Sequence, residues 1–455
     1  MDLVGKNILV IGNARSGIGA AKLAKLDGAN STIYDEKAYE KWDVKSQAQI
    51  DDLKKKGINY ILGQDPDVNS YDLAILSPGV PQDIPLVDAL KKAGVKITGE
   101  LEFASWHVNA PIIAITGTNG KTTTTTLVGE IMKSYNPKTF VVGNIGNAFS
   151  EEVPNITDDS IIVAEVSSFQ LETADTFHPK VSALLNITPD HLNRHKTMEN
   201  YCRCKYQVFV NQTAEDFALL NVRDEYYEDA KKYIKCNQID FSSSHEVARG
   251  AYLKGNVLCE NINGTEHEVC TTDELIIKGT HNVENALSAI AIATAFGVST
   301  ELIRNVLINF KGVEHRTEFV VTKNGVDYFN DSKATNTDAA IAGLVGLSSL
   351  KKPIRLIAGG MDKKISFEDW VKLFNGIVEK VYIIGETKQL IVDECKKQGF
   401  NNYETYNTLE EATMAAAKEA KSGEVVLLSP ACASWDMFES YEVRGRLFKD
   451  LVRSL

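Results

Sequence analysis

The chain has 455 residues, of which 44% are hydrophobic and 24% are charged. At about 100–200 residues per domain, this length predicts two to four globular domains, each with an ample core. The 61 acidic residues outnumber the 49 Lys and Arg residues, so the formal net charge is −12. This balance argues against non-specific binding of nucleic acids, although a local positive pocket for a small anion stays compatible with it.

The cysteines and the N-terminal sequence indicate a cytoplasmic protein. Seven cysteines are scattered through the chain without any C-x-x-C pair. We therefore expect reduced thiols, not a disulfide or zinc framework. The first residues lead directly into a strand and carry no signal-peptide segment, and no apolar run has the length of a membrane span. We expect a monomer without membrane insertion.

The N-terminal third alternates predicted strands and helices. Strands are expected at Asn7–Ile11, Ser31–Tyr34 and Leu73–Leu76, with a helix over Ile18–Asp27 after the first. This βαβ pattern predicts a Rossmann-like parallel sheet with its ligand-facing loops at the carboxyl ends of the strands. The first turn departs from G-x-G-x-x-G, because Asn13-Ala14 occupies the free position and the second glycine. An NAD site is weakly supported, and a nucleotide-diphosphate site or a packing role remains open.

The most informative segment is P-I-I-A-I-T-G-T-N-G-K-T-T-T-T-T, which begins at Pro111. A predicted strand, Ile112–Ile115, runs into a glycine turn and then a helix start. The free N–H groups of such a turn and the helix dipole form an anion site, to which Lys121 adds a charge. Thr122 offers a hydroxyl to a metal ion that bridges phosphates. The segment predicts an ATP site, although Ile115 stands where the usual motif has glycine, and the alternative is a turn before an ordinary helix.

Downstream of this loop, two more buried strands are expected, at Ile161–Val163 and Val181–Ile187. They lead into polar segments that contain Glu165 and His191. The stretch 215–275 is rich in turns and predicts an antiparallel β addition, and a helix is expected from about His281 to Phe296.

A third unit begins near Gly312. Its predicted strands all end in polar or glycine-rich loops and lie at Val326–Phe329, Ile354–Ala358, Val381–Ile384 and Val425–Leu428. Several such loops on one sheet edge predict a binding crevice.

Eight motifs occur in one order along almost the whole chain, and together they resemble the Mur ligases, the ATP-dependent enzymes that add amino acids during bacterial peptidoglycan synthesis. The motifs are Gly117–Thr123, Gly143–Gly146, Ala164–Gln170, Thr188–His191, Gly279–Asn285, His315-Arg316, Asn330–Asn336 and Ser429–Asp436. Within that family, N-D-S-K-A-T-N and S-P-A-C-A-S-W-D resemble the branch that adds D-glutamate.

The resemblance implies an α/β fold of three domains, each with a mostly parallel sheet. The expected domains are a Rossmann-like domain for the UDP substrate, an ATP-binding P-loop domain with a β addition, and a Rossmann-like amino-acid-binding domain, over residues 1–98, 99–311 and 312–455. It also implies that ATP phosphorylates the carboxylate of UDP-N-acetylmuramoyl-L-alanine and that D-glutamate then displaces the phosphate. Domain closure would assemble the site and exclude water.

The resemblance also assigns roles to residues. Catalytic roles fall on Lys121, Glu165, His191 and Lys205. The ATP-binding set is Gly117, Thr118, Asn119, Gly120, Lys121, Thr122, Thr123, Asn282, Asn285, Arg316 and Asp331. The UDP-substrate set is Arg15, Ser16, Asp35, Ser77, Gly79, Asn144 and Ser167, and the D-glutamate set is Lys333, Thr335, Lys363, Ser434 and Tyr441. Two Mg²⁺ ions are expected, on Thr122, Glu165, His191 and, if it is carbamylated, Lys205.

Each assigned residue also has an ordinary structural interpretation. Glu165 suits a surface position at a strand end, His191 a helix cap or a core, and Lys205 a solvated helix face. Cys202 and Cys204 replace the small residues usual before that lysine. Their i, i+2 spacing places them on different helix faces, which makes them a poor metal-binding pair.

Two other functions remain open. One is another ligase of the superfamily, such as a folylpolyglutamate synthase or a sister enzyme with a different amino acid, although the D-N-P-R loop expected of a diaminopimelate ligase is absent. The other is a Rossmann-type nucleotide-binding or redox-sensing module, which the broken glycine fingerprint and the loop lysine disfavour.

Overall fold

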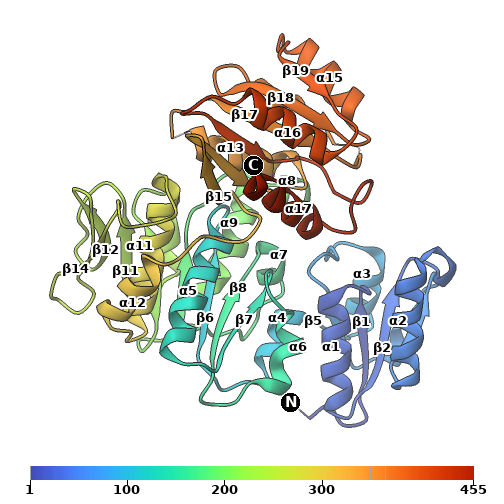
Figure 1. The fold of residues 1–455 in the computed structure, drawn as a ribbon. Coiled ribbons are helices and arrows are strands. Elements are labelled where there is room, and N and C mark those ends of the chain that lie inside the picture. Colours follow the sequence, from blue (N-terminus) through green and yellow to red (C-terminus); the bar gives the residue numbers. More distant parts are fainter. Residues whose placement is uncertain (1, 349, 364) are drawn as a thin grey trace. The chain divides into compact units, whose positions relative to one another are not determined.

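A computed structural model describes residues 2–348, 350–363 and 365–455, and these form three β-sheets (Figure 1). The chain divides into two compact units, Met1–Thr272 with Glu284–Leu307 and Asp273–Val283 with Ile308–Leu455. The first two sheets belong to the first unit and the third sheet to the second. The α/β fold with three mostly parallel sheets is therefore confirmed, while the boundaries at residues 98 and 311 remain predictions.

The first sheet is fully parallel in the order β3-β2-β1-β4-β5. Its strands are β1 (Asn7–Ile11), β2 (Asn30–Asp35), β3 (Asn59–Leu62), β4 (Leu73–Leu76) and β5 (Lys96–Gly99), and its helices are α1 (Arg15–Leu26), α2 (Val44–Lys55), α3 (Pro85–Lys92) and α4 (Glu100–Ser105). Ile8 and Val10 pack toward α1, whereas Leu9 and Ile11 pack toward α3. This alternation buries the sheet on both faces.

Helix α1 begins at Arg15, three residues before the expected Ile18. Gly17 explains the early start, because a Cβ atom on it would lie 2.0 Å from the carbonyl oxygen of Gly12. The glycine lets the first helical turn press against the strand exit, and so keeps that turn tight without a full glycine fingerprint.

The middle sheet has nine strands in the order β14-β13-β12-β11-β10-β9-β6-β8-β7. They are β6 (Ile112–Thr116), β7 (Thr139–Gly143), β8 (Ile161–Glu165), β9 (Val181–Leu184), β10 (Phe217–Asn221), β11 (Asn237–Ser242), β12 (Gly250–Lys254), β13 (Val257–Glu260) and β14 (His267–Thr271). The helices are α5 (Lys121–Tyr135), α6 (Phe149–Glu152), α7 (Ser168–Leu171), α8 (Leu192–His195), α9 (Met198–Tyr206), α10 (Tyr227–Ala230), α11 (Thr280–Ala295) and α12 (Thr300–Leu307). Figure 1 shows α5 beside β6, where it packs.

The predicted antiparallel addition over 215–275 is correct only for its second half. Strands β10, β11 and β12 continue the sheet in parallel, and only β12, β13 and β14 pair antiparallel. Segments longer than a hairpin turn join β10 to β11 and β11 to β12, so those strands run in the same direction. The Gly255-Asn256 turn makes the tight hairpin between β12 and β13 that the sequence indicated.

The third sheet has the order β15-β16-β20-β17-β18-β19, parallel except for the β15–β16 pair. The strands are β15 (Glu318–Lys323), β16 (Val326–Asn330), β17 (Ile354–Gly359), β18 (Val378–Ile384), β19 (Tyr403–Thr405) and β20 (Val425–Leu428). One face packs on α13 (Thr337–Ser348), α14 (Glu368–Lys372) and α15 (Lys388–Lys397), and the other on α16 (Leu409–Glu419) and α17 (Tyr441–Ser454).

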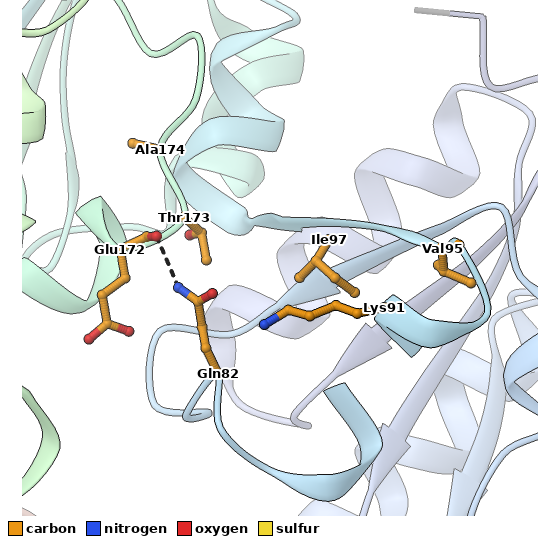
Figure 2. A pocket seen from close by; sticks show the side chains of 8 residues that line it. Gln82, Lys91, Val95, Ile97, Glu172, Thr173 and Ala174 are labelled. Atoms are coloured by element: carbon orange, nitrogen blue, oxygen red, sulfur yellow. Dashed lines mark hydrogen bonds between the residues drawn. The ribbon is translucent and has the colours of Figure 1, made fainter. Parts of the chain in front are cut away.

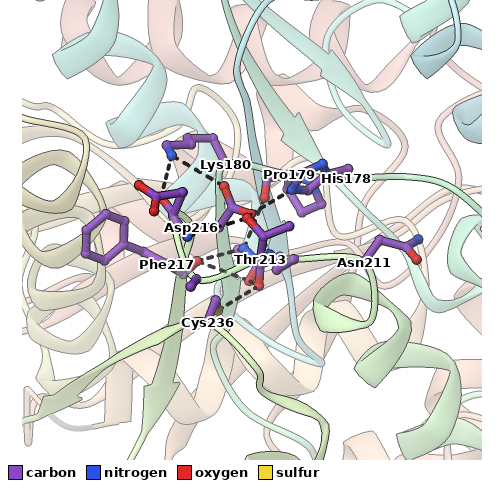
Figure 3. Close-up of polar contacts among 12 residues, drawn as sticks. His178, Pro179, Lys180, Asn211, Thr213, Asp216, Phe217 and Cys236 are labelled. Atoms are coloured by element: carbon purple, nitrogen blue, oxygen red, sulfur yellow. Dashed lines mark hydrogen bonds and ion pairs between the residues drawn. The ribbon is translucent and has the colours of Figure 1, made fainter.

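A polar cluster fixes the amino ends of β9 and β10, at the opposite edge of the middle sheet from its ligand-facing loops (Figure 3). Asp216 accepts hydrogen bonds from the backbone N–H and the hydroxyl of Thr213, at 2.7 and 2.9 Å, and contacts His178 Nε2 at 2.6 Å. Burial raises the pKa of Asp216, but these hydrogen bonds outweigh it and bring the pKa below its ordinary value. The cluster is a structural tie between strands.

Two sequence expectations concern features of the whole chain. All seven cysteines lie in the part of the chain that the structure describes, and all are free thiols, which confirms that expectation. No helix among the described residues has the length and apolar character needed to cross a membrane.

Candidate functional site

The glycine loop after β6 has the geometry of an anion site. Gly117 and Gly120 have φ angles of 150° and 82°, which side chains other than hydrogen rarely tolerate, and the helix α5 begins at once with Lys121. The Lys121 ammonium donates to the carbonyl oxygens of Gly117 and Thr118, at 2.9 and 2.8 Å. The loop therefore places one cation and the positive end of a 15-residue helix at the same point.

Residues from the exit of β9 hold this loop in place. The Asn119 backbone N–H donates to Asn186 Oδ1 at 2.8 Å, and the Thr118 hydroxyl contacts Tyr201 Oη at 2.9 Å. The backbone N–H of Thr188 donates to the Thr118 hydroxyl at 3.0 Å. Asn186 and Tyr201 were not singled out from the sequence, although both lie beside motif residues.

Glu165 is buried at the end of β8, in register with Ile115 of the loop-bearing strand. Asn144 Nδ2 donates to its Oε1 at 2.7 Å, while its other oxygen, Oε2, is buried and has no hydrogen-bond partner among the described residues. Gly143 allows its own backbone to lie close to that of Glu165, since a Cβ atom on Gly143 would lie 2.3 Å from the Glu165 carbonyl oxygen. A buried carboxylate with one free oxygen is costly on its own, and it suits a hard cation such as Mg²⁺.

Lys205 lies on α9 and is 1% exposed. Its Nζ donates to the Gly117 carbonyl oxygen at 2.7 Å. Burial first, and the nearby Lys121 ammonium second, lower the pKa of Lys205 well below its ordinary value. The solvated-lysine interpretation is wrong, because this lysine is buried directly against the glycine loop.

His191 precedes α8 with φ at 52°, an uncommon left-handed conformation for a histidine. About half of its side chain is exposed, and its Nε2 lies 3.4 Å from Asp190 Oδ2. The ring packs on Phe169 with centroids 4.8 Å apart. This histidine is therefore neither a core residue nor a side-chain cap, and its strained backbone presents the ring at a loop surface.

Four further predicted ATP residues lie on α5 and α11. Thr122 and Thr123 occupy the first turn of α5, and Asn285 Oδ1 accepts a hydrogen bond from the Thr124 hydroxyl at 3.2 Å. Asn282 lies one turn before Asn285 on α11, with its amide bonded to the Lys278 carbonyl oxygen at 2.9 Å. Asn285 thus contacts the helix that begins at the loop.

The predicted UDP-substrate residues follow the adjacent strands β2, β1 and β4 of the first sheet. Asp35 accepts a hydrogen bond from the Asn13 backbone N–H at 3.0 Å, Ser77 donates to the Gly12 carbonyl oxygen at 3.2 Å, and Gly79 is exposed. Ser16 lies on the first turn of α1. These residues converge on the turn after β1, as predicted for strand exits.

Arg15 does more than face that turn. Its guanidinium donates to the Gly146 carbonyl oxygen at 2.5 Å and to Glu151 Oε2 at 2.9 Å, both in the segment that follows β7. These Arg15 bonds join the first sheet to the segment that carries Asn144.

Ser167, also predicted for the UDP substrate, caps α7, and its hydroxyl donates to Gln170 Oε1 at 3.0 Å.

The predicted D-glutamate residues gather at one edge of the third sheet. Lys333 and Thr335 follow β16, Ser434 follows β20 and Lys363 follows β17, and these three strands are neighbours. Tyr441 begins α17, and its carbonyl oxygen accepts a hydrogen bond from Ser332 at 2.8 Å. The Lys363 ammonium lies 5.7 Å from the ring centroid of Trp435, which is 67% exposed.

Arg444 was missed by the sequence reasoning, and it organises this edge. It is 1% exposed and donates to the carbonyl oxygens of Ser332 and Cys432, at 2.9 and 3.1 Å. Burial lowers the pKa of Arg444 to about 10. Nothing in the sequence distinguishes it from a surface arginine of an amphipathic helix.

Arg316 and Asp331 belong to the same unit. Arg316 is exposed between His315 and Thr317, whose φ angles of 64° and 43° strain the backbone on both sides. Asp331 is buried and accepts hydrogen bonds from the Ser429 hydroxyl at 2.8 Å and the Thr317 backbone N–H at 3.1 Å. Burial raises the pKa of Asp331 to about 6.

The substitution Asp331→Asn should stabilise the protein above pH 6. Because its pKa is raised in the folded state, the folded protein loses stability as pH rises from about 4 to 6, and an amide avoids that cost. At about 1.4 kcal/mol per pH unit, the gain should be about 3 kcal/mol at pH 8 and close to zero at pH 4. Urea unfolding of the parent chain and the variant at pH 4 and pH 8 measures the difference in the free energy of unfolding. The same difference at both pH values would show that the charge of Asp331 is not its cause.

A cavity of about 430 Å³ lies in the first unit but contains none of the predicted site residues. Its lining joins the β4–β5 region to the segment after α7 and comprises Gln82, Lys91, Gly94, Val95, Ile97, Glu172, Thr173 and Ala174 (Figure 2). Gln82 Nε2 donates to the Glu172 carbonyl oxygen at 2.9 Å. The predicted substrate residues lie instead at the strand exits.

The structure has three β-sheets packed with helices, and polar loops follow their strands. One of these loops, after β6, carries glycines and Lys121 at a helix start, and this combination defines a nucleotide-dependent enzyme of several domains. Residues 115–293 match the model of the Mur ligase middle domain, and residues 315–432 match that of the Mur ligase glutamate ligase domain. The chain belongs to the Mur ligase family.

Full-length relatives support this membership. Proteins of Lachnospira eligens and Clostridioides difficile, both named UDP-N-acetylmuramoylalanine–D-glutamate ligase, are 47% and 45% identical over 458 residues, with 100% of each chain covered. Among solved structures, a UDP-N-acetylmuramate–alanine ligase, MurC, of Thermotoga maritima matches 99% of both chains with a TM-score of 0.59 at 19% identity. That structural likeness supports the fold.

Proposed function

We propose that this chain is an ATP-dependent ligase that joins D-glutamate to UDP-N-acetylmuramoyl-L-alanine in cytoplasmic peptidoglycan precursor synthesis. The full-length relatives named for that reaction support the proposal. The observation that carries it is the surroundings of the glycine loop, where Lys121 and Lys205 both donate to the Gly117 carbonyl oxygen and Glu165 ends the strand that pairs with the loop-bearing strand. A redox module would need none of these three groups.

The proposed reaction brings several negatively charged oxygens close together, and the glycine loop offers a lysine and backbone N–H groups that can stabilise them. The γ-phosphate of ATP moves to the substrate carboxylate, and the amine of D-glutamate then attacks the acyl phosphate and expels phosphate. Lys121 and the first N–H groups of α5 would stabilise the moving phosphoryl group. The backbone of Gly117 and Gly120 brings those N–H groups close to the oxygens without a side chain in between.

The donor set fits Mg²⁺. Glu165, with its unpartnered buried Oε2, and Thr122 would hold one ion, and His191 and a carbamylated Lys205 would hold the second. When bound, Mg²⁺ neutralises phosphate charge and bridges phosphate oxygens. Asn144 orients Glu165 through its 2.7 Å hydrogen bond, whatever the occupancy of the site.

The environment of Lys205 supports the proposed carbamylation. Carbon dioxide reacts with a neutral amine, forming an N–C bond and releasing one proton, and burial beside Lys121 favours the neutral form of Lys205. The product is a carboxylate, whose negative charge would be attracted to the nearby Lys121 ammonium.

The remaining predicted residues would bind the other substrates. Lys333, Thr335, Lys363, Ser434 and Tyr441 provide cations and hydroxyl groups for the two carboxylates of D-glutamate. Arg15, Ser16, Asp35, Ser77 and Gly79 would contact the UDP end, with Asn144 and Ser167 nearer the acceptor. Asn282, Asn285, Arg316 and Asp331 would contact ATP. We also propose the domain boundaries at 98/99 and 311/312 and a monomeric state.

Release of phosphate tests the proposal. The full chain is incubated with ATP, Mg²⁺ and UDP-N-acetylmuramoyl-L-alanine against D-glutamate, L-glutamate, diaminopimelate and glycine. We expect release with D-glutamate only, together with a product heavier by one glutamyl residue. Release with L-glutamate or diaminopimelate but not with D-glutamate would overturn the substrate assignment, and oxidation of NADH or reduction of NAD⁺ would favour the redox module.

A further inference from the structure

We propose that Glu172, His195 and Cys204 form a site for a divalent cation of the Zn²⁺ class. None of the three has a role in the proposed ligation. One ligand atom from each, a carboxylate oxygen, an imidazole nitrogen and the thiol sulfur, lies within 4.8 Å of the other two. This carboxylate, imidazole and sulfur set is typical of Zn²⁺ and unsuited to Mg²⁺, which takes oxygen ligands.

The three residues come from neighbouring short elements. Glu172 directly follows α7, His195 is the last residue of α8, and Cys204 lies on α9. His195 Nδ1 is already 3.4 Å from Glu172 Oε1. Ligands around a tetrahedral Zn²⁺ are about 3.3–3.8 Å apart, so side-chain adjustments of about 1 Å close the cluster around an ion.

The surroundings supply the partners that a metal-binding histidine needs. His195 is 5% exposed, and its other ring nitrogen, Nε2, lies 3.0 Å from the Ser168 hydroxyl. A hydrogen bond on that side fixes the ring and leaves Nδ1 for the metal. Cys204 completes the set with a sulfur that Zn²⁺ binding would deprotonate.

Arg194 contacts both oxygens of Glu172. Its Nη2 donates to Oε2 at 2.7 Å, and its Nε donates at 3.1 Å to Oε1, the oxygen that faces His195, so an ion at the cluster would share Oε1 with Arg194 or displace the Nε hydrogen bond. The same guanidinium donates to the carbonyl oxygens of Pro78 and Val80, both at 3.0 Å. A cation at the cluster would therefore sit between the first-sheet loop that contains Ser77 and Gly79 and the helix that carries Lys205, so binding should inhibit the ligase.

Helix α9 carries a second thiol outside the cluster. Cys202, two residues earlier on α9, is buried in the core that contains Tyr201 and Tyr206, and it is no part of the cluster. The helix thus carries one thiol in the proposed site and one matched thiol outside it.

Co²⁺ is the probe, because a thiolate ligand gives it a charge-transfer band in the near ultraviolet. We expect the full chain to bind one Co²⁺ with this band, and Zn²⁺ to displace it. Cys204→Ala should abolish the band and weaken binding at least about tenfold, whereas Cys202→Ala should retain both. Zn²⁺ should inhibit phosphate release by the parent chain and by Cys202→Ala at least about tenfold more strongly than by Cys204→Ala.

Three results would overturn the site: a parent chain with no thiolate band, a band that survives in Cys204→Ala, or a band that disappears in Cys202→Ala. Circular dichroism of each variant without metal checks that it is folded. The absorption measurement needs no substrate, so it stands even if the proposed ligation fails. Equal inhibition of Cys204→Ala and the parent chain would overturn the link to activity.

Discussion

Replacing Lys205 by alanine should lower kcat/KM for ligation about a thousandfold, and a small carboxylic acid such as propionate should restore part of the activity. Lys205 donates to the Gly117 carbonyl oxygen and is 1% exposed, so its removal leaves a small buried space beside the ATP loop. A free carboxylate can fill that space and replace the charge of the carbamate. The size of the loss follows from losing one electrostatic group at a site where phosphoryl charge develops.

Two variants separate this effect from a loss of structure. Lys205→Gln fills the space without a charge, so it should be inactive and should not respond to propionate. Arg203→Ala, at an exposed position on the same helix, should stay close to the parent activity. After incubation with ¹³C-labelled bicarbonate, the parent chain should show one carbamate carbon signal that Lys205→Gln lacks. Rescue of the glutamine variant, or the same signal in it, would refute the carbamate.

Much of the fold could be predicted, because strand signals were strong where strands are buried on both faces. Runs such as Asn7–Ile11 and Val425–Leu428 have the predicted bounds. The main error was the direction of β10 and β11. Strand direction depends on the path of the connection between strands, and the sequence pattern of a single strand does not record that path.

The site shows a similar division. Residues at strand ends or in the loops after them, such as Glu165, Ser77 and Ser434, could be located because strand ends are visible in the sequence. Arg444, Arg194 and Tyr201 act through contacts to residues 12 to 116 positions away in the sequence, such as the bond between Arg194 and Pro78. No local pattern marks such a residue, since its partner is set by the packing of whole sheets. The burial of Lys205 was likewise invisible in a helix that also contains exposed Arg203.

Replacing Lys121 by alanine is the second change from which we expect a large effect, about a thousandfold in kcat. Lys121 is the first residue of α5 and is held over the loop by the carbonyl oxygens of Gly117 and Thr118. The N–H groups of the loop and the helix dipole remain in the variant, so nucleotide affinity should fall much less than kcat. Lysine stabilises charge most strongly while the γ-phosphoryl group moves between oxygens, and its loss therefore appears mainly in the chemical step.

The measurement pairs phosphate release with displacement of a fluorescent ATP analogue. Lys133→Ala is the matched control, since Lys133 lies in the last turn of the same helix with its side chain half exposed. We expect that variant to match the parent chain in both assays. An activity of Lys121→Ala within tenfold of the parent would show that the helix N-terminus alone suffices. A loss confined to nucleotide affinity, with kcat intact, would instead make Lys121 a binding residue, because uniform binding of ground and transition states leaves kcat unchanged.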